Sequence, residues 1–201
     1  MIKIIMNTYS DIPHPFELIK RDRIHRLHSP KDSFVFHQGD TPKYLYYLLS
    51  GSARLLRHTP SGRMVTLHTA RAGNFLAEVS LYSAQYHCDC IAKDDCRFVA
   101  FHKSDVLFLL AENPKFAAAL AQNLARQIQR YRKQLELRSI QSANERVLAG
   151  LSDGWLTSSI MAFSDDLGLT HEATYRALAK LVTQGAVLKT GRGKYRVLGP
   201  A

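Results

Sequence analysis

Residues 170–180 combine side chains that can read the edges of DNA bases. Glu172 can accept a hydrogen bond from the amino group of cytosine, and Arg176 can donate two to guanine. The two residues lie four positions apart, so they share one face of a helix. Tyr175 and Lys180 are better suited to contacts with the DNA backbone. The spacing predicts a base-reading helix, and an exposed ion pair between Glu172 and Arg176 is compatible with the same spacing.

The residues around this helix fit a helix-turn-helix motif. Thr170 is a favoured N-cap residue and His171 follows it as the first helical position. Gly168 supplies the tight turn after a preceding short helix, and Leu178 and Leu181 form the apolar face of the second helix. This arrangement predicts a motif whose second helix enters the major groove, with an ordinary helical hairpin as the alternative.

Residues 184–198 predict a β-hairpin directly after the second helix. Two short apolar segments flank a basic turn that contains Arg192 and Lys194. A hairpin with cations at its tip is the wing of a winged helix, and its cations suit backbone phosphates. Helix and wing together make double-stranded DNA the expected partner.

A second group of chemically capable residues lies between His87 and Cys96. Histidine and the Cys88-Asp89-Cys90 sequence can bind a thiophilic metal, form a redox thiol set, or ligate haem through His87. On a β-strand, however, Cys88 and Cys90 share one face, and His87 and Asp89 lie on the other, which splits the ligands. Buried cysteine is also a common core residue. A core role and a sensory role both remain open.

Composition limits the class of protein. The chain has 201 residues, enough for one large or two small domains. It has no apolar run of membrane-spanning length and no cleavable signal pattern, so we expect a cytoplasmic protein without a membrane partner. Three cysteines argue against a disulfide framework. Outside the cysteine group no nucleophile–base pair or metal–acid set stands out, so we do not expect an enzyme.

The net charge of +10 is concentrated on one segment. Residues 115–140 carry six Lys/Arg against one Asp/Glu, whereas residues 141–201 carry seven against five. The basic excess therefore lies beside the expected reading helix rather than on it. Attraction to phosphates and a solvated helix face both account for it.

The amino-terminal half predicts mainly β structure. Residues 16–29 have helical spacing, with an apolar face of Phe16, Leu18, Ile19, Ile24 and Leu27. From residue 33 to residue 101, short strands alternate with turns rich in Gly, Pro and Asp. That alternation predicts a small antiparallel barrel or jelly roll.

A long helix is predicted to join the two halves. A short helix over 104–111, capped by Ser104, precedes a helix that starts at Asn113-Pro114. Its apolar stripe serves either as core or as a dimer seam. The stripe consists of Phe116, Leu120, Leu124, Ile128, Tyr131 and Leu135.

The expected architecture is α+β in three parts. Residues 1–112 form an effector-sensing β-roll domain, residues 113–139 the long dimerisation helix, and residues 140–201 the winged helix-turn-helix domain. The first helix of the last domain covers residues 141–151, which places a hinge near 138–141.

Three segments, in order along nearly the whole chain, resemble the Crp/Fnr family of bacterial transcription regulators. Residues 36–51 resemble the start of its cyclic-nucleotide-binding fold, and residues 73–82 resemble its phosphate-binding cassette. The helix-turn-helix follows. The resemblance implies a homodimer paired in parallel through residues 116–135, a near-palindromic DNA site, and RNA polymerase as a further partner.

The resemblance also indicates where the contacts to cyclic AMP have changed. The family's Gly-Glu pair reads Ala77-Glu78, which keeps the carboxylate for the ribose, and its Arg-Ser pair falls on His87-Cys88 or Cys88-Asp89. The Thr-Ser pair of the long helix falls on Tyr131-Arg132. We therefore expect an effector pocket of Glu78, His87, Cys88, Tyr131 and Arg132, and an effector other than cyclic AMP, or none.

Two further departures refine the expectation. The iron–sulfur sensors of the family use a cysteine group before the barrel, and no cysteine precedes Cys88 here. In family members the reading helix opens Arg-Glu-x-x-x-x-Arg, whereas this chain has His171, Glu172 and Arg176. The DNA site is therefore not expected to equal that of the relatives. The alternatives are a cyclic-nucleotide-binding regulatory module, or a redox, metal or haem sensor that uses the Cys88/Cys90/Cys96 region.

Overall fold

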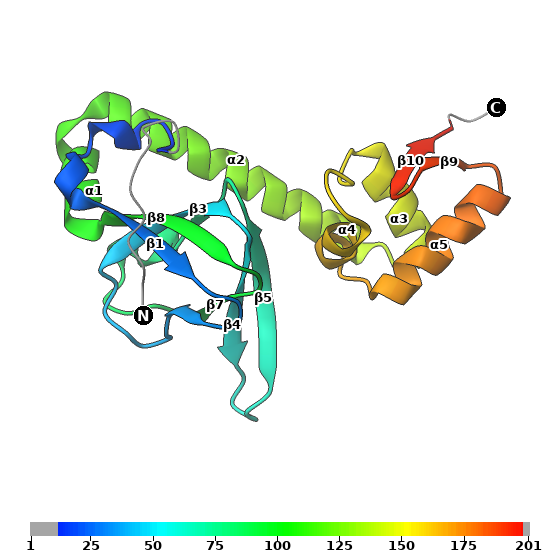
Figure 1. Cartoon of the computed structure of the whole chain (residues 1–201), viewed down its shortest axis with the longest axis horizontal. Coiled ribbons are helices and arrows are strands. Elements are labelled where there is room, and N and C mark those ends of the chain that lie inside the picture. The colour runs from blue at the N-terminus through cyan, green and yellow to red at the C-terminus, as the bar shows by residue number, and fades with distance from the viewer. Residues whose placement is uncertain (1–11, 199–201) are drawn as a thin grey trace. The chain divides into compact units, whose positions relative to one another are not determined.

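A computed structural model describes residues 12–198 and shows two compact units (Figure 1). The first unit ends at Leu124 and the second begins at Ala125, so the boundary falls inside a continuous helix, α2 (Pro114–Ser139). Each unit has its own buried apolar core.

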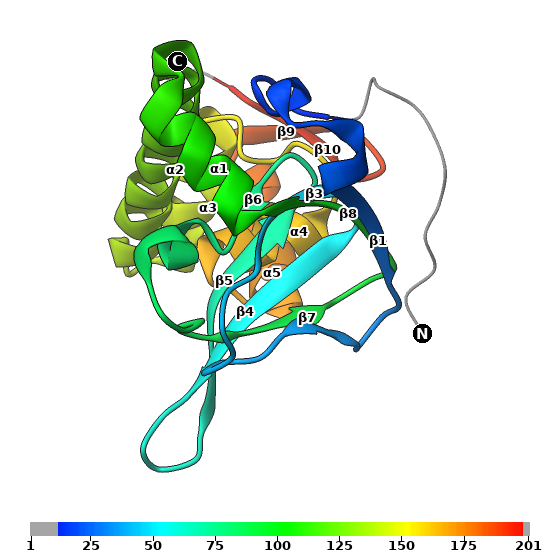
Figure 2. The same ribbon diagram turned by 90° about the vertical axis from the view of Figure 1, so that its left-hand side faces the viewer.

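The amino-terminal unit contains two antiparallel sheets of four strands each. Strand order is β1-β8-β3-β6 in one and β2-β7-β4-β5 in the other. The first sheet comprises β1 (Ile24–Ser29), β8 (Cys96–His102), β3 (Tyr44–Ser50) and β6 (Phe75–Leu76). The second comprises β2 (Phe34–Phe36), β7 (Asp89–Ala92), β4 (Ser52–His58) and β5 (Met64–Arg71). The antiparallel jelly roll expected from the sequence is confirmed, and Figure 2 shows the β4–β5 hairpin extending beyond it.

The core of the roll draws residues from both sheets. Leu48 and Phe98 come from the first sheet, and Ala53 and Cys90 from the second, and all four are fully buried. The turn from β3 to β4 requires a glycine at Gly51. A Cβ there would lie 2.6 Å from the carbonyl oxygen of Asp95, and the residue has a φ of +88°.

The predicted helix over 16–29 is wrong. The segment forms two short 3₁₀ turns, η2 (Phe16–Leu18) and η3 (Arg21–Arg23), and then strand β1. β1 pairs with β8 along its whole length, with Leu27 opposite Phe98. Its partner lies about 70 residues later in the chain, so the local helical spacing gives no sign of the pairing.

Two helices follow the roll. α1 (Lys103–Glu112) begins one residue before the predicted start, and its N-cap position is His102 rather than Ser104. α2 begins as predicted, where the side-chain oxygen of Asn113 accepts a hydrogen bond of 3.0 Å from the amide of Phe116. The side chains of Phe116 and Leu120 are buried in the roll's second cluster, with Phe16 and Phe101.

The carboxyl-terminal unit packs a small helical bundle against a hairpin. Its elements are α3 (Ala143–Ser152), α4 (Ile160–Leu167), α5 (His171–Thr183), β9 (Val187–Gly191) and β10 (Lys194–Val197). Side-chain oxygens of Ser142, Ser159 and Thr170 cap the three helices. Leu137 of α2 belongs to this unit's core, where it is 1% exposed.

Candidate nucleic-acid interface

The turn between α4 and α5 has the geometry that the sequence predicts. Gly168 ends α4 in the left-handed region, with a φ of +65°. Thr170 then caps α5, because its hydroxyl oxygen accepts a hydrogen bond of 3.1 Å from the amide of Ala173. Cap and turn together fix where α5 begins and therefore which residues occupy its first exposed turn.

α5 has one buried face and one exposed face. Ala177, Leu178 and Leu181 are each less than 5% exposed and pack on the core of the unit. The predicted DNA-contacting side chains of α5 are exposed. They are His171, Glu172, Tyr175, Arg176 and Lys180.

Two pairs order the exposed side chains. A guanidinium nitrogen of Arg176 lies 3.5 Å from a carboxylate oxygen of Glu172, and both side chains are more than 70% exposed. Such a pair contributes only a few tenths of a kcal/mol, so it holds the two groups loosely and leaves both accessible to bases. The rings of His171 and Tyr175 meet edge to face at 6.1 Å.

The wing lies beside the reading helix. β9 and β10 pair in antiparallel fashion, and Arg192 and Lys194 are exposed at the turn. Burial and the nearby Tyr175 hydroxyl raise the pKa of Tyr195, which places these two tyrosines close together. The structure also exposes Arg196 on β10, a cation that the sequence pattern did not single out.

The cysteine group is divided between two faces of β7, as the alternation predicts. Cys88 and Cys90 pack in the core of the roll, whereas the carboxylate of Asp89 points to the opposite side. There its oxygens lie 3.6 Å from Nδ1 of His37 and 3.7 Å from Nδ1 of His58. The amide of Gln38 also donates to it at 2.9 Å.

Burial makes the thiols poor nucleophiles. It is the largest cause of the raised pKa of Cys88, Cys90 and Cys96, so each thiol stays protonated at neutral pH. Across residues 12–198, no three side chains of His, Cys, Asp or Glu converge as a metal site requires. This placement favours a core role for the cysteines.

The expected effector residues are divided between the two compact units. Glu78 starts a 3₁₀ turn, η4 (Glu78–Tyr82), directly after Ala77, which is left-handed with a φ of +67°. Glu78 lies close enough to Cys88 for its negative charge to add to the rise in the pKa of the thiol, which is caused mainly by burial. Tyr131 and Arg132 lie on α2 in the other compact unit.

The residues beside Glu78 do not fit the phosphate of a cyclic nucleotide in the expected way. His87 is exposed, and the adjacent Cys88 is a neutral, buried thiol. Arg57, which was not among the residues predicted for the site, donates from Nε and Nη2 to the carbonyl oxygen of His87 at 3.1 and 2.8 Å. Those two donors are thus used by the protein's own backbone.

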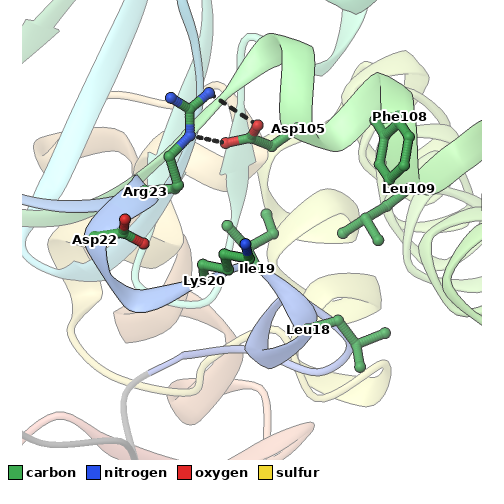
Figure 3. Close-up of a pocket in the computed structure, with 8 residues that line it drawn as sticks. All are labelled: Leu18, Ile19, Lys20, Asp22, Arg23, Asp105, Phe108 and Leu109. Atoms are coloured by element: carbon green, nitrogen blue, oxygen red, sulfur yellow. Dashed lines mark hydrogen bonds and ion pairs between the residues drawn. The ribbon is translucent and has the colours of Figure 1, made fainter.

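A pocket of about 370 Å³ lies elsewhere on the roll, between the η2–η3 segment and α1 (Figure 3). Arg23 and Asp105 form a bidentate ion pair at one end, with distances of 2.9 and 3.0 Å. Apolar side chains, among them Phe108, form the other wall. None of the predicted effector residues lines it. The lining residues are Leu18, Ile19, Lys20, Asp22, Arg23, Asp105, Phe108 and Leu109.

Comparison with known proteins bears on both units. The cyclic nucleotide-binding domain family matches residues 26–113. The nitrogen fixation regulation protein FixK of Bradyrhizobium diazoefficiens is 28% identical over 178 residues, which are 81% of this chain and 73% of that protein. These matches make the chain similar to transcription regulators of the Crp/Fnr family.

Other relatives agree with this Crp/Fnr assignment. The cyclic AMP receptor protein of Thermus thermophilus is 32% identical over 123 residues, 61% of this chain, and the match spans 57% of that relative's length. The structure of FixK2 from Bradyrhizobium japonicum has the same fold, with a TM-score of 0.64 at 22% identity, and the match covers 88% of this chain and 93% of that one. Within residues 12–198, no helix is both long and apolar enough to cross a bilayer.

Proposed function

We propose that this protein is a homodimeric, sequence-specific DNA-binding transcription regulator that acts on a near-palindromic site. The observation that carries the proposal is the exposed polar face of α5. It presents Glu172 and Arg176 as a loosely held pair on a helix whose other face is anchored in the core. A carboxylate and a guanidinium in this position can read cytosine and guanine edges in the major groove.

The basic wing supports the same function. Arg192, Lys194 and Arg196 are exposed on the hairpin that follows α5, and Tyr195 of this hairpin lies near Tyr175 of the helix. Cations on a hairpin next to the base-reading face are suited to contact backbone phosphates. Such contacts fix the position of the helix on DNA but carry no sequence information. RNA polymerase, the remaining partner expected from the family, is part of the proposal.

The dimer seam is proposed to be shorter than the stripe in the sequence. Phe116 and Leu120 are buried in the core of the roll, so they are not available for contacts between two chains. Further along α2, Ile128 is 50% exposed and Leu135 is 67% exposed. Leu124 and Tyr131 are partly exposed and continue the spacing of four, three and four residues.

Control by an effector other than cyclic AMP, or by none, completes the proposal. The replacement of the phosphate-binding pair by His87-Cys88 or Cys88-Asp89 supports it. The alternative effector, a cyclic nucleotide, is favoured by the family match over residues 26–113. Calorimetric titration with cyclic AMP tests the proposal, since heat of binding would exclude it, and titration with cyclic GMP tests whether another cyclic nucleotide is the effector.

The base-reading role is tested with duplexes selected by the protein from a random library. Arg176→Ala is expected to cost about 1–3 kcal/mol on the selected site and to relax base choice at one position of each half-site. Arg192→Ala is the matched control, expected to weaken all sequences alike and to reduce the salt slope. If Arg176→Ala lost affinity equally for random duplex, Arg176 would not read bases.

A further inference from the structure

The last turns of α2 are fastened to the carboxyl end of α4. Arg138 donates from Nε to the carbonyl oxygen of Asp166 at 3.3 Å and from Nη2 to that of Asp165 at 3.0 Å. Gln134, one turn earlier, donates to the same Asp166 oxygen at 3.1 Å. The side chain of Arg138 also lies against Gly168, where an added Cβ would be 3.2 Å from Nε. We call Gln134, Arg138 and these carbonyls the clasp.

The clasp satisfies groups that a helix leaves open. The final carbonyls of a helix have no partner within it and carry the negative end of its dipole. A guanidinium donates to two of them in a fixed fork, which a flexible ammonium does not reproduce. Arg146 of α3 donates to a third carbonyl of this helix end, from Nη1 to the carbonyl oxygen of Leu167 at 3.1 Å.

Three further contacts hold the same segment of α2 against the winged-helix unit. Leu137 is buried in its core. Lys133 lies 3.1 Å from the carboxylate of Asp153, and the guanidinium of Arg130 lies 5.7 Å from the ring centre of Trp155. α2 therefore bonds to the winged helix on one face, while Ile128 and Leu135 stay exposed on another.

We infer that the clasp makes Arg138 a positioning residue for α5. The segment of α2 from Ala125 and the helix-turn-helix form one body, so the way two chains pair along α2 fixes where each reading helix lies. Arg138 acts through α4 and the Gly168 turn, and it does not itself contact DNA. This inference rests on the proposed homodimeric DNA binding.

The test measures affinity for duplexes in which the separation of two half-sites varies by one base pair at a time. Wild type is expected to prefer one separation strongly, because rigid dimers match a single half-site spacing. Arg138→Ala is expected to lower that preference about tenfold, the effect of losing one charged hydrogen bond. Its affinity for a duplex with a single half-site is expected to stay unchanged. An unchanged spacing profile, or an equal loss on the single half-site, would overturn the inference.

Two variants separate the clasp from simple charge. Arg138→Lys keeps the charge but cannot donate to both carbonyls in the same geometry, so its profile is expected to follow that of Arg138→Ala. If Arg138→Lys had the same half-site spacing profile as wild type, the proposed role of the clasp would be refuted. Lys115→Ala removes one positive charge from the amino-terminal end of the same helix and is expected to leave the profile intact.

Hydrogen exchange tests the clasp without DNA. In the wild type, the amides of residues 134–139 are expected to exchange as slowly as those of α4, and Arg138→Ala is expected to speed the former about tenfold. Equal exchange in both proteins would refute the clasp. Failure of wild type to bind any duplex, with the exchange result as expected, would instead refute the proposed function.

Discussion

The winged-helix unit exposes the charged side chains of α5, whereas the β-roll buries its three cysteines. On α5, Glu172 and Arg176 are each more than 70% exposed and form an ion pair with each other. In the roll, Cys90 and Cys96 are fully buried and Cys88 is 9% exposed. Exposure suits recognition of a large external partner, while burial suits packing. The contrast supports the proposed DNA-reading role of α5 and a packing role for the thiols.

The largest expected effect concerns the proposed pairing of two chains along α2. Ile128→Glu combined with Leu135→Glu would place carboxylates in the seam. Each uncompensated buried charge costs about 3–5 kcal/mol, so the dimer is expected to dissociate at micromolar concentration. Sedimentation velocity measures the change, and the affinity for a two-half-site duplex should fall with it.

Gln129→Glu is the control for this double variant. Gln129 is exposed and adjacent in sequence to Ile128, but it lies off the line of Leu124, Ile128, Tyr131 and Leu135. It adds one of the two negative charges that the double variant adds, at a position outside the seam, and is expected to leave the dimer intact. A double variant that stayed dimeric would move the seam elsewhere and weaken the contrast between the two units.

A smaller effect is expected at the start of the reading helix. Thr170→Ala removes the cap of α5, which costs about 1 kcal/mol of stability. Thr183→Ala is the matched control, because that hydroxyl donates to the carbonyl of Ala179 inside the helix. It should change the free energy of unfolding by less than about 0.5 kcal/mol. Urea unfolding measures both, and similar losses would show that the cap does not define α5.

The smallest effect on DNA binding is expected from the thiols. Because burial raises the pKa of Cys88, Cys90 and Cys96, they should react with a disulfide reagent far more slowly in the native protein than in urea. The Cys88→Ser, Cys90→Ser double variant should bind DNA as wild type does, with or without oxidant. Rapid native reaction, or an oxidant response lost in the variant, would restore a sensory role.

The raised thiol pKa also sets a pH dependence of stability. Above about pH 8.5, the ordinary pKa of cysteine, the unfolded chain releases thiol protons that the folded chain keeps. The free energy of unfolding should therefore decline as pH rises beyond that value, and the thiol contribution is fully present below it. Urea unfolding at pH 7 and pH 9.5 measures the decline, which should be smaller in Cys90→Ala.

Local sequence signals predicted the elements whose stability is local. The cap at Thr170, the turn at Gly168 and the start of α2 at Pro114 each depend on neighbours within a few residues, and the structure confirms them. Strand β1 depends on β8 instead, so helical spacing over residues 16–29 misled the prediction.

The candidate sites show the same division. The exposed face of α5 follows from spacing alone, and the structure places every expected residue on it. The clasp could not be predicted, since Arg138 meets carbonyls 27 and 28 residues later through the fold. The same holds for Arg57, whose partner His87 is 30 residues away.

Ala77, in the cassette of residues 73–82, has a left-handed backbone conformation, which glycine adopts freely and alanine does not. An alanine there is less favourable than glycine by roughly 1–2 kcal/mol, yet φ remains at +67°. The neighbouring Leu76 and Leu81 are buried at 1% and 4% exposure, and they hold the loop from both sides. The cassette is thus shaped by its hydrophobic flanks, and its backbone contour does not require a glycine at this position.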